Sequence, residues 1–181
     1  MDTGQQFEQV IHLCREIFRK KLGDYGASWR IMRPSSVTDQ LFIKAYRIRC
    51  LEMKKESRIA EGIQPEFAAI VNYGVIGLIQ LALGPCMAPD MPVDEALALY
   101  DRYITQSEEL MHAKNHDYDE AWRSMRITSY TDLILTKIHR VRQIENHDGQ
   151  TLVSEGIDAN YMDMINYALF GLIKLEFGEA L

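Results

Sequence analysis

Apolar residues recur three and four positions apart near the N-terminus and again at about 93–113, and this spacing predicts two amphipathic helices. The apolar positions are Phe7, Val10, Ile11, Cys14, Ile17 and Phe18 in the first segment, and Leu97, Tyr100, Ile104 and Met111 in the second. A third segment, 67–83, is apolar apart from Asn72, Tyr73 and Gln80, which is typical of a fully buried helix or of a membrane span.

The helical pattern occurs twice because the chain contains two copies of one unit. Residues 21–52 match residues 114–145 without a gap, and 14 of these 32 positions are identical. Residues 61–84 match residues 155–178, with 10 of 24 positions identical. Two matches of this density indicate a tandem duplication.

The duplication predicts how the chain is organised. Repeat one covers 4–84, a Pro-rich junction covers 85–92, and repeat two covers 93–178. A unit of three helices is marginal on its own. We therefore expect both repeats to pack around a shared core and a pseudo-twofold axis, as a single compact domain over 1–181.

Local signals suggest where the helices begin and end. Ser36 with Asp39, and Ser129 with Asp132, have the spacing of a capping box at the start of the second helix of each repeat. Gly84 and Gly178 are expected to end the third helices. The predicted fold is an all-α helical bundle built from a duplicated three-helix unit.

Charge and composition exclude several classes of protein. The net charge of −6 and the pI near 5.4 argue against bulk nucleic-acid binding. In the second copy the apolar segment carries Asp163, Lys174 and Glu176, charges that do not suit lipid, so a membrane span is not expected. The N-terminus lacks a signal-peptide pattern and the cysteines form no CxxC pair, which favours a cytoplasmic protein. Rossmann, P-loop and hydrolase-elbow motifs are absent from the sequence.

Polar residues that are identical in both copies are the candidates for chemistry, because the rest of each copy has drifted. The candidate ligand-binding residues are Asp24, Tyr25, Trp29, Arg30, Lys44, Arg47, Glu61 and Asn72 in the first copy, and Asp117, Tyr118, Trp122, Arg123, Lys137, Arg140 and Asn166 in the second. Each also has a structural interpretation, such as a helix cap for Asp39 or a core anchor for either tryptophan.

The second copy carries the fuller set. Asp163 and Asn166 share a helix face, and Glu155 precedes that helix. Carboxylate and amide oxygens suit Mg²⁺, so Glu155 and Asp163 are the candidate metal-binding and catalytic residues. Ala69 replaces the aspartate in the first copy.

The remaining groups of the second copy suit a nucleotide. Lys137, Arg140 and Arg123 are candidates to bind phosphate, and Trp122 or Tyr118 to stack on a base. The sequence thus predicts a nucleotide-binding protein, a monomer or homodimer, for which Mg²⁺-dependent cleavage of a phosphate chain is a further expectation.

The alternative hypothesis is a non-catalytic helical interaction protein. In that case the repeated polar residues form an internal salt-bridge network, in which Lys137, Arg140, Glu145 and Glu155 pair with one another. Nothing in the sequence alone decides between the two.

The order of these residues also resembles a known family. The matching residues are Lys21, Asp24, Tyr25, Gly26, Trp29, Lys44, Arg47, Glu61, Asn72 and Tyr73 in the first copy, and Lys114, Asp117, Tyr118, Trp122, Lys137, Arg140, Glu155, Asp163, Asn166, Tyr167 and Ala168 in the second. They resemble the nucleotide modification associated domain family, which is all-helical, and this resemblance implies a link to modified-nucleotide pathways. A more distant likeness is to MazG-like all-helical nucleoside triphosphate pyrophosphatases, although their ExxE…ExxD motif is not met here.

Overall fold

A computed structural model describes residues 1–54 and 62–178, and over these residues the protein contains helices and no strands. The α-helices are α1 (Thr3–Tyr25), α2 (Pro34–Met53), α3 (Gln64–Leu83), α4 (Val93–Tyr118), α5 (Ile127–Asn146) and α6 (Ile157–Phe177). Short 3₁₀ helices, η1 (Ser28–Ile31) and η2 (Ala121–Ser124), occupy the tryptophan-containing segments. The predicted all-α class is confirmed.

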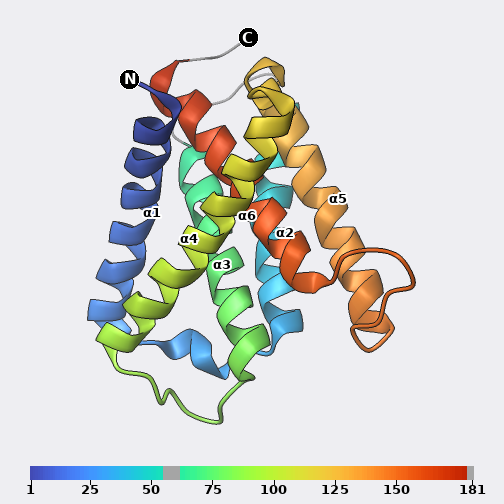
Figure 1. Cartoon of the computed structure of the whole chain (residues 1–181). Coiled ribbons are helices and arrows are strands. Elements are labelled where there is room, and N and C mark those ends of the chain that lie inside the picture. Colours follow the sequence, from blue (N-terminus) through green and yellow to red (C-terminus); the bar gives the residue numbers. More distant parts are fainter. Residues whose placement is uncertain (55–61, 179–181) are drawn as a thin grey trace.

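The helices form three layers, with α3 and α6 in the middle (Figure 1). α2 and α5 cover one side of this central pair, and α1 and α4 cover the other. Exchanging the two copies maps each packed pair onto another, so that α2–α3 corresponds to α5–α6 and α1–α6 to α4–α3. The duplicated helical unit predicted from sequence is therefore present, with approximate twofold symmetry.

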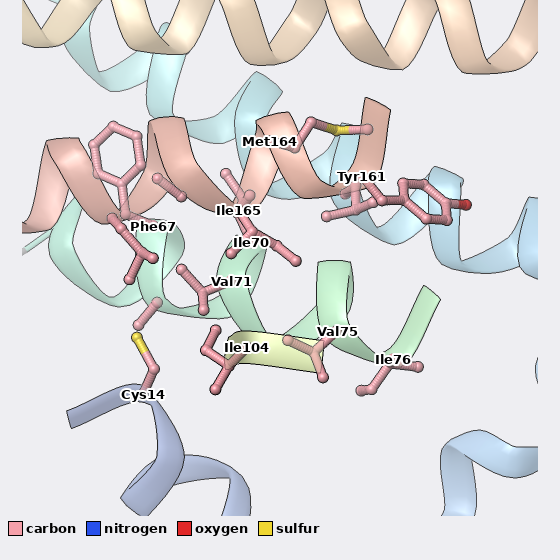
Figure 2. Close-up of a cluster of buried hydrophobic side chains, with 14 of the residues drawn as sticks. Cys14, Phe67, Ile70, Val71, Val75, Ile76, Ile104, Tyr161, Met164 and Ile165 are labelled. Atoms are coloured by element: carbon pink, nitrogen blue, oxygen red, sulfur yellow. The ribbon is translucent and has the colours of Figure 1, made fainter. Parts of the chain in front are cut away.

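The centre of the bundle is the apolar contact between α3 and α6. Figure 2 shows Ile70 and Val71 on α3 facing Ile165 on α6, and all three are fully buried. Small residues let the helices approach: a Cβ added to Gly77 would lie 2.6 Å from the ring of Tyr161. Because both helices are covered on two sides, they are apolar nearly all round.

The same packing shows whether the apolar helix α3 is a membrane span or a core helix. α3 is long and apolar enough to cross a membrane, but 72% of its most apolar window is buried inside the bundle. Its symmetry mate α6 buries Asp163 and Lys174 in the equivalent layer. Both are core helices of a helical bundle, as predicted.

The predicted capping boxes are wrong. α2 begins at Pro34 and α5 at Ile127, with Arg33 and Arg126 at the N-cap positions and no side-chain cap. Proline is favoured at the first position of a helix because it has no N–H to leave unpaired. Ser36 and Ser129 consequently lie inside their helices. The predicted C-caps are confirmed, since Gly84 and Gly178 end α3 and α6 with positive φ angles of 75° and 70°.

The threonines and acids of the supposed capping segments have another role: they join α2 to α5. These cross-copy contacts come in symmetric pairs, so that a residue of one copy binds the same partner type in the other. The contacts are Arg142–Asp39 at 3.0 Å, Arg49–Asp132 at 3.1 Å, Thr38–Glu145 at 2.6 Å and Thr131–Glu52 at 2.6 Å. Several polar residues shared by the copies are thus explained by the interface between them.

Candidate functional site

Two cavities lie at positions related by the twofold symmetry. The first has a volume of about 430 Å³ and is enclosed by α1, η1 and α3. The second, of about 420 Å³, is enclosed by α4, η2 and α6. Every residue that lines the second cavity has its sequence counterpart in the lining of the first. Residue types identical in both are Lys21 and Lys114, Tyr25 and Tyr118, Trp29 and Trp122, Met32 and Met125, Asn72 and Asn166, and Tyr73 and Tyr167.

The 3₁₀ helices place the tryptophans in the cavity walls. Each turn is held from the central layer by one long side chain that donates to two of its carbonyl oxygens. Gln80 Nε2 donates to the Arg30 oxygen at 2.9 Å and to the Met32 oxygen at 2.6 Å. At the equivalent position, the buried Lys174 donates to the oxygens of Arg123 and Met125. Gln80 and Lys174 therefore hold the 3₁₀ helix of their own copy through equivalent hydrogen bonds.

Buried polar atoms without a partner are present in both cavities. Trp29 and Trp122 are only 8% and 6% exposed, and among the described residues neither indole N–H has a hydrogen-bond acceptor. The side-chain oxygen of Asn166 is also unpaired within the described part of the chain. Asn72, in contrast, accepts from Tyr100 at 2.7 Å. A buried donor or acceptor of this kind costs stability unless something binds it.

The asparagines are anchored by the same contact in each copy. Asn72 donates to the Cys14 carbonyl at 3.0 Å and Asn166 donates to the Ser107 carbonyl at 3.0 Å. Phe7 occupies the position that corresponds to Tyr100, so Asn166 lacks the phenol that satisfies Asn72. In each copy the amide nitrogen thus binds a backbone carbonyl of α1 or α4, and the ligand contact of the asparagines stays a prediction.

The cavities differ most in charge. In the second cavity, Asp163 accepts from Lys114 at 2.7 Å and from Lys137 at 2.8 Å, using one carboxylate oxygen for each. Partial burial lowers the pKa of Lys114, but the hydrogen bond and charge of Asp163 outweigh it, and the net shift is upward. In the first cavity the aspartate is replaced by Ala69.

The first copy has its own acid, one turn earlier on the central helix. Glu66, 4% exposed, lies 2.5 Å from Arg47 and 3.6 Å from Lys44. Glu66 does not line the first cavity. Lys44 and Lys137 therefore both have a buried acidic partner. Within the described residues, the partner of Lys137 also binds the cavity lysine, Lys114, whereas the partner of Lys44 makes no ion pair with Lys21.

Tyrosines form the rim of each cavity. Tyr25 is 58% exposed and Tyr118 is 70% exposed, although both line cavities. Burial, with a contribution from Tyr25, raises the pKa of Tyr73. Burial and the charge of Asp163 likewise raise the pKa of Tyr167. With their pKa values raised, the phenols of Tyr73 and Tyr167 remain neutral hydrogen-bond donors at physiological pH.

Several predicted site residues lie elsewhere. Arg30 is buried and donates to Gln80, to the Gly84 carbonyl, to Cys86 and to Asp90. Arg123 contacts residues of α1 and stacks 4.4 Å from the centre of the Trp122 ring. Both arginines thus hold the fold together, and neither lines a cavity.

The Trp122 ring is not free to stack on a base. Phe170 lies parallel to it at 4.4 Å, and the Arg123 guanidinium packs over it as well. Asp24 and Asp117 are exposed outside both cavities. Glu61 lies outside the described residues.

Lys137, Arg140 and Glu155 line a separate surface groove of about 630 Å³ beside the second cavity. Lys137 connects the two through its ion pair with Asp163. The network predicted by the alternative hypothesis differs in its partners, because Lys137 pairs with Asp163 and Glu145 accepts from Thr38.

The magnesium site stays a prediction that this geometry does not favour. Both oxygens of Asp163 already bind ammonium groups, which a metal ion would have to displace. Over residues 1–54 and 62–178, no three His, Cys, Asp or Glu side chains gather closely enough to hold a metal ion. We therefore derive no chemical step through Mg²⁺.

The candidate set omitted Lys21, Lys114, Tyr73, Tyr167 and Glu66. The first four are identical in both copies, and that identity was a sufficient signal to include them. Glu66 had no such signal, because its counterpart is Asn160.

The fold and its cavities define a class: duplicated helical bundles with a pair of symmetry-related cavities. A family model described as nucleotide modification associated domain 1 matches the chain twice, over residues 21–81 and 114–175. The chain therefore belongs to this family, and the two matches coincide with the two copies. Comparisons with curated proteins and with solved structures gave no significant match. The likeness to MazG-like enzymes stays a prediction.

Proposed function

We propose that the protein binds a nucleotide, or a small molecule derived from one, in these cavities. The observation that carries the proposal is the recurrence of one lining in both copies: a lysine, two tyrosines, a tryptophan and an asparagine at matching positions. The family's association with nucleotide modification supports the same ligand class.

The lining suits the parts of a nucleotide. A cavity of about 430 Å³ falls within the range of small-molecule sites. The rim tyrosines present rings that stack on bases, and the buried indole N–H is a donor for a base carbonyl or ring nitrogen. The cavity lysine supplies a point charge for phosphate.

Some observations favour the alternative, an interaction protein without a ligand, but they concern other residues. Thr38, Asp39, Glu52 and their counterparts join α2 to α5 and need no ligand. The cavity tyrosines take no part in those contacts, so the interface does not explain why both copies contain them.

A binding experiment separates these functions. Nucleoside mono-, di- and triphosphates are tested by thermal shift and calorimetric titration, with and without Mg²⁺. A ligand at 100 times its Kd stabilises the folded state by about 2.7 kcal/mol, which is readily measured. If no nucleotide at millimolar concentration raises the Tm, the proposal is wrong.

A tyrosine variant locates the binding. Tyr25→Ala combined with Tyr118→Ala removes the rim tyrosine of each cavity, and stacking worth about 1–3 kcal/mol predicts a loss of affinity of about fivefold to 150-fold. Tyr46→Ala is the matched control, because Tyr46 is equally exposed at 55% but lies outside both cavities. Equal losses in the two proteins would mean that binding occurs elsewhere.

Cleavage of the phosphate chain is a separate proposal that depends on Glu155 and Asp163. Incubation of nucleoside triphosphates with Mg²⁺ and chromatography of the products tests it. Absence of any product leaves a binding protein, and retention of cleavage in Glu155→Gln would rule out the assigned carboxylate.

A further inference from the structure

The second cavity contains its own anion. The Asp163 carboxylate lies in the cavity wall, with only 7% of its side chain exposed, and it binds Lys114 at 2.7 Å. The lysine of this cavity therefore already has an anionic partner without a ligand. A second ammonium, that of Lys137, holds the same carboxylate from the far side at 2.8 Å.

The first cavity has the lysine without the anion. Lys21 occupies the position of Lys114, and Ala69 occupies the position of Asp163. The acid of this copy, Glu66, binds Lys44 and Arg47 instead, outside the cavity. No ion pair of Lys21 is found within residues 1–54 and 62–178, and no acidic residue is among those that line this cavity.

The other polar groups around the first cavity are donors. Tyr25 and Tyr73 contribute hydroxyls, and Ser28 contributes another. The Trp29 N–H is buried and unpaired within the described residues, at a position more than nine-tenths buried. The amide of Asn72 is already satisfied by the Cys14 carbonyl and the Tyr100 hydroxyl. Donors around a single cation form an electrostatic environment for an anion.

We infer that the first cavity binds the phosphate of its ligand between Lys21 and Ala69, in the place that the Asp163 carboxylate occupies in the second cavity. The inference rests on the proposed function for the nucleoside part of the ligand. In the second cavity the Asp163 carboxylate already fills the corresponding place beside the cavity lysine, so we expect one phosphorylated ligand per chain.

The substitution that tests this copies the second cavity into the first. Ala69→Asp places a carboxylate beside Lys21, and Ala69→Asn is the matched control with nearly the same shape and no charge. Calorimetric titration of the full chain uses the ribonucleosides, their monophosphates, inorganic phosphate and pyrophosphate. We expect one site per chain in the natural protein, at least a tenfold loss of affinity for phosphorylated ligands in Ala69→Asp, and a much smaller loss in Ala69→Asn.

A second variant tests the same inference without placing a new charge in the cavity wall, in case Ala69→Asp does not fold. Lys21→Met removes the cation at an exposed position and should weaken phosphorylated ligands while leaving nucleoside affinity unchanged. Lys54→Met, at an exposed lysine that lines neither cavity, is the matched control and should leave ligand affinity unchanged. The Tm of each unliganded variant establishes that it folds.

The outcomes separate the two proposals. Equal affinity of Ala69→Asp and Ala69→Asn for a monophosphate, or two equal sites per chain, overturns this inference while nucleotide binding stands. Binding of pyrophosphate that Ala69→Asp abolishes, without binding of any nucleotide, supports the inference and overturns the proposed function. Absence of binding by every anion overturns both.

Discussion

The ion pair between Lys137 and Asp163 is largely buried, and Asp163→Ala is the change that probes it. The side chains are only 12% and 7% exposed. Removing one partner of a buried pair costs about 3–5 kcal/mol because the other charge is left unpaired. Lys137 also lines a surface groove, which lets its ammonium turn towards water, so we expect a value of about 3 kcal/mol, at the lower end of that range.

Urea unfolding followed by circular dichroism measures this loss. With a denaturant slope of roughly 2–3 kcal/mol per molar, the midpoint should fall by about 1 M. Lys137→Ala and the double variant complete a double-mutant cycle. Because the double variant leaves no unpaired Lys137 charge, its loss should be smaller than the sum of the single losses by about 2 kcal/mol. Losses that add to within about 0.5 kcal/mol would refute the reasoning, since uncoupled residues behave in that way.

Three further predictions concern the two interfaces of the bundle. Burial raises the pKa of Glu52 above its ordinary value of 4.5, so the folded state favours the protonated acid and the unfolding free energy falls as the pH rises through the raised pKa. Glu52→Gln should make this fall shallower in urea titrations between pH 4 and 8, and an unchanged slope would contradict the assignment. Gly77→Ala should lower the Tm, because overpacking of about 1–3 kcal/mol against Tyr161 outweighs a gain of up to about 1 kcal/mol in helix propensity. Gly171→Ala, where the nearest atom is 3.0 Å from the added Cβ, should lower the Tm less, and the opposite order would mean that the closer contact relaxes. Asp39→Asn breaks an exposed pair and should cost less than about 1 kcal/mol in the same urea assay; a larger loss would show that the pair does more than align α2 with α5.

Most of the fold follows from the sequence because helical periodicity and duplication are both visible in it. The spacing around Phe7 predicts α1, and the charges of α6 show that its apolar mate α3 is a core helix. The starts of α2 and α5 were misplaced because a hydroxyl and a carboxylate three residues apart form a capping box only when the helix begins there. Thr38 and Asp39 sit instead where α2 meets α5, a contact that local sequence does not reveal.

The site was predicted in part. Comparison of the copies identified the rim tyrosines Tyr25 and Tyr118 together with the tryptophans and asparagines, all of which line the cavities, but the candidate set left out Tyr73 and Tyr167. It also included Arg30 and Arg123, whose partners lie far away in sequence and make them structural. The phosphate-binding role of Lys137 stays a prediction, but its ion pair with Asp163 was not predicted, because spacing gives the face of a helix and not the acid that contacts it.

The contacts between α2 and α5 occur twice, as they do between identical subunits of a symmetric dimer. Two separate identical chains would carry every substitution at both positions, so their sites would stay alike. Joining the halves through the segment after Gly84 removes that constraint. One half can then have an alanine at the position where the other half has an aspartate. A single polypeptide can thus evolve one half for recognition while the other half keeps an internal carboxylate at the same place.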